Sequence, residues 1–93
     1  MSYQWAGRTA WQIIITPKAR HELERLSPQT KSRVVEALER LAKEGRGDVV
    51  KLHGVPEVWR LRVGDWRVRF RRDSPAHSIV VLQVLPRGQG YRR

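Results

Sequence analysis

The stretch 57-EVWRLRVGDWRVRFRR-72 predicts a two-stranded hairpin with Gly64-Asp65 as its two-residue turn. Glycine supplies the positive φ that such tight turns need. Because side chains alternate across a strand, one face of this hairpin is apolar and is expected to form core. That face carries Trp59, Leu61, Val63, Trp66, Val68 and Phe70, while the opposite face pairs Arg62 with Arg67 and Arg60 with Arg69.

Facing arginines make the second face of the hairpin unusual. Like charges directly opposite each other destabilise a sheet, so two such pairs favour an anion between them. The planar guanidinium fork suits phosphate oxygens. We therefore predict a phosphate-binding sheet face; the competing interpretation is a solvated outer face of an amphipathic hairpin.

Two helices are expected before the hairpin. A β-branched, apolar strand at 11–15, expected to be buried on both faces, precedes Thr16-Pro17, which is a helix start signal. Leu23 and Leu26 would dock this first helix. Ser27-Pro28 repeats the signal for a longer helix that ends at Gly45, and Gly47 is expected to loosen the connection that follows.

After the hairpin, residues 79–85 form a last apolar strand. The order is β-α-α-β-β-β, an α+β fold with a small, mostly antiparallel sheet and two N-terminal helices on one face. The helices protect one side only, so the arginine side can face water. We expect a single domain over residues 1–93, with residues 1–10 as a possible extension.

The composition favours an anionic partner. Among the 93 residues the formal net charge is +10, and residues 51–93 carry 10 Lys/Arg against 3 acidic residues. Such a field attracts nucleic acid, an acidic protein or, least favoured here, a membrane surface. The chain has no cysteine, and its three histidines are scattered, so we expect no metal and no cofactor. No signal-peptide pattern is present, which predicts a cytoplasmic protein.

The chain resembles the RelE/ParE superfamily of bacterial toxins over residues 11–93. The resemblance rests on "TPKARHELERL", then "KLHG" and "WRLRVGDWRVRF", an apolar strand and a terminal "PRGQGYRR". It implies a toxin held inactive by a cognate antitoxin with an acidic segment. RelE-like members cut mRNA in the ribosomal A site without a metal, by attack of the 2′-hydroxyl on the adjacent phosphate. ParE-like members instead poison DNA gyrase.

The same resemblance implies roles for individual residues. The basic positions of the RelE-like strands fall on Arg60, Arg62 and Arg67, and the basic residue that opens the preceding loop matches Lys51. Arg62 and Arg67, with Arg60 adjacent, are the expected catalytic clamp that stabilises the charge developing on the phosphate. Together with Lys51 and Arg69 they are also the expected contacts to RNA phosphates. The C-terminal pair falls on Arg87, as a donor or positive charge near the leaving oxygen, and on Tyr91, as a base-stacking or phosphate contact.

The general base is the open point. RelE-like enzymes commonly have lysines where this chain has Arg60 and Arg62, and arginine does not give up its proton. His53 is the titratable substitute, and the alternative is a loop histidine without a role. We therefore expect an mRNA endoribonuclease acting on the ribosome. A gyrase inhibitor of the ParE type and a basic module that binds RNA without cutting it are the alternatives.

Overall fold

The predicted hairpin is present in the computed structural model, which describes residues 10–90. Its strands are β3 (Val58–Val63) and β4 (Trp66–Asp73), and Gly64 between them has φ 59°. The predicted register is confirmed at every position, with Val63 opposite Trp66, Leu61 opposite Val68 and Trp59 opposite Phe70. Arg62 therefore faces Arg67, and Arg60 faces Arg69.

The hairpin lies inside a five-stranded sheet with the order β1-β5-β4-β3-β2. The other strands are β1 (Gln12–Ile15), β2 (Val49–Lys51) and β5 (Ser78–Pro86), and a last turn of helix, α3, covers Arg87–Gly90. Only β1 runs parallel to its neighbour in this sheet, and the other described pairs are antiparallel. The α+β class and the two-helix arrangement are thus confirmed, and the short β2 and α3 are additions to the predicted order.

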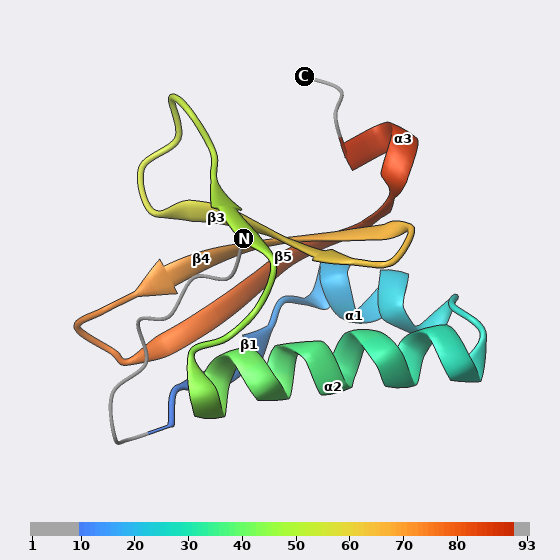
Figure 1. Ribbon diagram of the computed structural model, residues 1–93, viewed down its shortest axis with the longest axis horizontal. Coiled ribbons are helices and arrows are strands. Elements are labelled where there is room, and N and C mark those ends of the chain that lie inside the picture. The colour runs from blue at the N-terminus through green and yellow to red at the C-terminus, as the bar shows by residue number, and fades with distance from the viewer. Residues whose placement is uncertain (1–9, 91–93) are drawn as a thin grey trace.

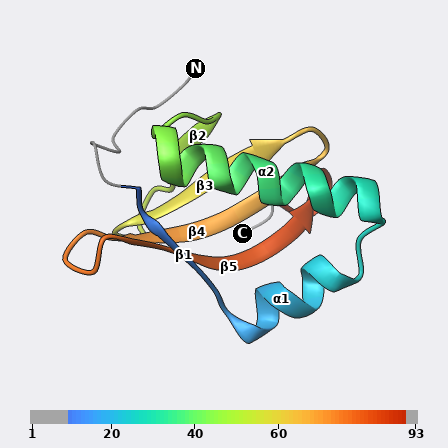
Figure 2. The same ribbon diagram turned by 90° about the horizontal axis from the view of Figure 1, so that it is seen from below.

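Two helices cover one face of the sheet. Helix α1 (Pro17–Glu24) and helix α2 (Pro28–Glu44) lie on the same side, with α2 crossing the strands (Figures 1 and 2). Both begin as predicted: Thr16 and Ser27 accept N–H groups of the first turns, each followed by proline. Gly45 ends α2 with φ 69°, whereas Leu26 lies just beyond the end of α1. None of the helices in residues 10–90 combines the length and apolar character needed to cross a bilayer.

The core lies between this helical layer and the sheet. Its members come from the predicted apolar face of the hairpin, from both helices and from β5; those with exposures of 1% or less are Ala19, Val34, Leu38, Leu41, Leu61, Val68, Phe70, Ile79 and Val81. Val63 and Trp66, near the turn, are half-buried against it. Trp59 and Phe70 are therefore core residues, as predicted, and Trp66 packs against the core from the turn end.

Two sequence predictions about packing were wrong. Strand β1 is not buried on both faces: it is an edge strand with β5 as its neighbour, and the side chain of Ile14 is 45% exposed. Gly47 does not loosen a connection but packs closely, since a Cβ there would lie 3.0 Å from Leu61 Cδ1. Of the possible extension at residues 1–10, only Ala10 falls within the described residues.

Candidate nucleic-acid interface

Four arginines form a cross-strand ladder, hereafter the arginine ladder, made of Arg60 and Arg62 on β3 and Arg67 and Arg69 on β4. Residues directly opposite on paired strands point to the same side of a sheet. The ladder therefore shares the face opposite Trp59, Leu61, Val68 and Phe70, which pack against the helices. Helices α1 and α2 leave this second face uncovered (Figure 1). The loop between β2 and β3 and helix α3 both stand on that side.

Arg67 is the buried member of the arginine ladder. Only 3% of it is exposed, and its Nη1 donates to the carbonyl oxygens of Gly64, at 3.0 Å, and Trp66, at 2.9 Å. Those bonds hold the guanidinium against the hairpin turn. Arg67 therefore serves the turn directly, and its contribution to a ligand on this face is a nearby positive charge.

Arg62, which faces Arg67, is the exposed member of that pair. Its side chain is 60% exposed, and its Nε lies 2.6 Å from Asp48 Oδ2. Sequence reasoning missed Asp48, because nothing local marks a residue 14 positions away as the partner of an arginine on another strand. The second pair is half-buried, and Arg69 Nη1 donates to Gln83 Oε1 on β5 at 3.1 Å.

Arg71 extends the ladder by one position along β4. It lies opposite Val58, which is on the same face of β3 as Arg60 and Arg62 because it is two residues from Arg60. Its side chain is 47% exposed and lies 3.9 Å from Asp73. The signal was present in the sequence, since Arg67, Arg69 and Arg71 alternate at the period of a strand.

Arg87 opens α3 next to the hairpin turn. Its backbone N–H donates to the carbonyl oxygen of Asp65 at 2.7 Å, and Pro86 pairs with Trp66. The side chain is exposed. The carbonyl oxygens of residues 64–66 thus all accept hydrogen bonds, from the Arg67 side chain and from the Arg87 backbone. These bonds hold the start of α3 beside the end of the ladder where Arg62 lies. Tyr91 lies outside the described residues.

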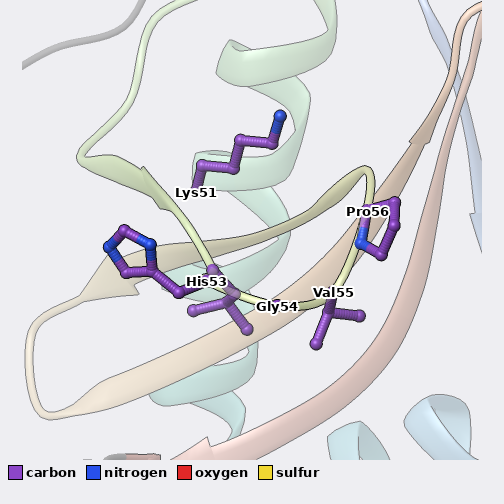
Figure 3. Close-up of a pocket in the computed structure, with 6 residues that line it drawn as sticks. Lys51, His53, Gly54, Val55 and Pro56 are labelled. Carbon is purple, nitrogen blue, oxygen red and sulfur yellow. The ribbon is translucent and has the colours of Figure 1, made fainter.

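Lys51 and His53 do not join the arginine ladder in the structure. Lys51 lies opposite Trp59, so it belongs to the face of the sheet that packs against the helices. Its Nζ lies 5.9 Å from the centroid of the Trp59 ring. His53 is exposed on the loop that follows β2, and Figure 3 shows the two side chains leaving the backbone in different directions. They border a shallow hollow of about 530 Å³ formed by residues 51–56. Within residues 10–90, no hydrogen bond or ion pair links His53 to the ladder.

Residues 10–90 contain no group of three or more His, Asp or Glu side chains placed to hold a metal ion. The ladder face offers guanidinium groups, the Gln83 amide and two carboxylates, Asp48 and Asp73, each beside an arginine. Such a set binds anions by charge-assisted hydrogen bonds.

A family model described as the ParE toxin of the type II toxin–antitoxin system parDE matches residues 13–91. The chain belongs to the RelE/ParE family of type II toxin–antitoxin toxins. No curated protein matches this toxin.

Solved structures of RelE proteins share the fold of this RelE/ParE-family toxin. An archaeal RelE–RelB complex from Pyrococcus horikoshii has 26% identity and a TM-score of 0.73, covering 87% of this chain and 99% of that one. The RelBE2 toxin–antitoxin complex of Mycobacterium tuberculosis has 25% identity and a TM-score of 0.73, with coverages of 87% and 95%. The intact Escherichia coli RelBE complex, at 18% identity, a TM-score of 0.70 and coverages of 83% and 96%, shows the fold alone.

The exposure of its arginines limits what this toxin can do on the ladder face. Arg62 and Arg87 present exposed side chains at the turn end, and Arg71 does so at the other end. An extended phosphate chain suits such a row better than a single enclosed anion does, because the face is open and the charges are spread along two strands.

Proposed function

We propose that this toxin is an endoribonuclease that cuts mRNA on the ribosome, with the arginine ladder face bound to the RNA phosphates. The observation that carries the proposal is the pairing of Arg60 with Arg69 and of Arg62 with Arg67 on the sheet face that the helices leave open. Facing cations are unfavourable unless an anion lies between or above them. A ribose-phosphate chain supplies that anion at regular intervals.

The proposed reaction is attack of a ribose 2′-oxygen on the adjacent phosphorus. The new P–O2′ bond forms as the P–O5′ bond breaks, which leaves a 2′,3′-cyclic phosphate and a free 5′-hydroxyl. The 2′-hydroxyl proton passes to an acceptor, and the departing O5′ takes up a proton. Arg62 and Arg87, exposed at the same end of the ladder, would stabilise the extra negative charge on the phosphoryl oxygens.

His53 remains our candidate for the proton acceptor. It lies on the β2–β3 loop, which stands on the ladder side of the sheet (Figure 1). Histidine is the side chain suited to exchange protons near neutral pH. A guanidinium group has no free lone pair with which to accept the proton.

A second candidate function, inhibition of DNA gyrase, is favoured by a specific feature of the ladder face. Among the described residues of that face, the titratable side chains are the arginines and two carboxylates paired with them, Asp48 and Asp73, and none is a lysine or histidine. A docking surface needs no proton acceptor. The matching family model also carries the ParE description.

We further propose that a cognate antitoxin with an acidic segment covers the ladder face. The solved relatives include RelE proteins in complex with RelB antitoxins. The toxin has a formal net charge of +10, so it attracts an acidic segment during encounter, and complementary charges also orient the bound segment.

Replacing the two ladder arginines of β3 should weaken RNA binding and cleavage. In Arg60→Ala/Arg62→Ala, the slope of log affinity for single-stranded RNA against log salt should fall by about 1.4, since about 0.7 is lost per phosphate contact. Cleavage of mRNA on the ribosome should fall about 100-fold or more. The measurements are RNA binding over a salt series and primer extension on translated mRNA.

The matched control is Arg33→Ala/Arg40→Ala on α2. It removes the same charge from two exposed positions of the helical layer, so it reports the effect of net charge alone. Equal changes in both double variants would contradict a role for the ladder face in RNA binding.

A further inference from the structure

Asp48 is joined to Arg62 by two bonds. The backbone N–H of Arg62 donates to the Asp48 carbonyl oxygen at 2.8 Å, and its Nε lies 2.6 Å from the Asp48 carboxylate. The backbone hydrogen bond fixes the position of the Asp48 main chain beside Arg62. The side-chain contact then places the carboxylate at the edge of the guanidinium group that a phosphate oxygen would use. An acidic residue thus lies on the ladder face, against its most exposed strand arginine.

The chain reaches this position through a tightly packed connection. Gly45 ends α2 in a left-handed conformation with φ 69°. Gly47 then passes so close to the core that a Cβ would lie 3.0 Å from Leu61 Cδ1, directly beside Arg62 in the sequence. The close approach carries the following residue, Asp48, to the edge of β3. Its carboxylate is therefore held at Arg62 by the fold.

The pair is also open to exchange. The Arg62 side chain is 60% exposed and that of Asp48 is 38% exposed, so water and ions reach both partners. An ion pair at this exposure is weak and screened by salt. A phosphate can displace the carboxylate, and the pair then opposes phosphate binding by about two- to five-fold in affinity.

We propose that Asp48 occupies Arg62 in the free protein, competes with phosphate for it and so lowers the affinity of the ladder face for RNA. A ligand phosphate that binds Arg62 must displace the Asp48 carboxylate, so the cost of breaking this ion pair is subtracted from the binding free energy. This inference rests on the proposed function of the ladder face as an RNA-binding surface.

The test is ribosome-free binding of a single-stranded RNA oligonucleotide, followed by fluorescence anisotropy over a salt series. Asp48→Asn should bind about two- to five-fold more tightly than wild type at low salt. The gain in affinity should disappear in an Arg62→Ala background, because that variant lacks the guanidinium group for which Asp48 and phosphate compete. Asp48→Glu, which keeps the charge, should bind like wild type.

Glu39→Gln is the charge control, since Glu39 is exposed on α2 and its change adds the same unit of net charge. A gain in Asp48→Asn no larger than in Glu39→Gln would overturn the inference. So would an equal gain in the Arg62→Ala background, or the absence of RNA binding by both wild type and Asp48→Asn. Cleavage is read separately: tighter binding by Asp48→Asn without any mRNA cleavage would leave this inference standing and reject the nuclease.

Discussion

Phe70→Ala is expected to remove about 3–5 kcal/mol from the free energy of unfolding. Phe70 is 0% exposed, lies opposite Trp59 and belongs to the core cluster between the sheet and the helices. Truncating a buried ring loses its burial and leaves a cavity that the neighbouring strands cannot fill. Because a small domain has only about 5–15 kcal/mol in total, this variant should lie near the limit of folding. Chemical denaturation followed by circular dichroism measures the loss.

Val50→Ala provides the matched control for that experiment. Val50 lies on the short edge strand β2 and is 46% exposed, so its truncation should cost less than about 1 kcal/mol. A loss below about 1 kcal/mol for Phe70→Ala would contradict the assignment of the apolar hairpin face to the core.

Arg67→Met and Arg62→Met are expected to separate two roles within one facing pair. Arg67→Met should destabilise the protein by about 2–4 kcal/mol, because the turn carbonyl groups of Gly64 and Trp66 lose their buried donor. Arg62→Met removes an exposed ion pair with Asp48 and should cost less than about 1 kcal/mol. Thermal or denaturant unfolding of both variants gives the comparison.

RNA binding should follow the opposite order in this pair. The folded fraction of Arg67→Met keeps Arg62 exposed and should retain most of its salt-dependent RNA affinity, whereas Arg62→Met should show a shallower salt slope. Arg67→Lys, which keeps one donor, should recover part of the stability lost in Arg67→Met. Equal stability losses in the two methionine variants would contradict the buried role of Arg67.

The hairpin was predictable because its information is local. A two-residue turn at Gly64-Asp65 fixes the register, and the register then assigns every side chain to a face. The helix starts were predictable for the same reason, since Thr16-Pro17 and Ser27-Pro28 act within one turn. The exposed edge position of β1 was not, because an apolar sequence does not say how many neighbours its strand will have.

The candidate site was predicted as a set of positions, and its contacts were not. Sequence alternation places Arg62 and Arg67 on one face, but it cannot show that the first is 60% exposed in its side chain and the second 3% exposed overall. Burial of Arg67 depends on how its guanidinium folds back to the turn. The Asp48 contact depends on a tertiary path through Gly47. The roles proposed for His53 and Tyr91 stay predictions.

The most direct test of the proposed nuclease is primer extension on mRNA in a purified translation system with added toxin, run beside a gyrase supercoiling assay. We predict cuts in A-site codons that require ribosomes, with 2′,3′-cyclic phosphate ends and unchanged supercoiling. Intact mRNA together with inhibited supercoiling would contradict the nuclease and assign the arginine ladder to gyrase docking. Intact mRNA with unchanged supercoiling would contradict both and leave a basic surface that binds RNA without cutting it.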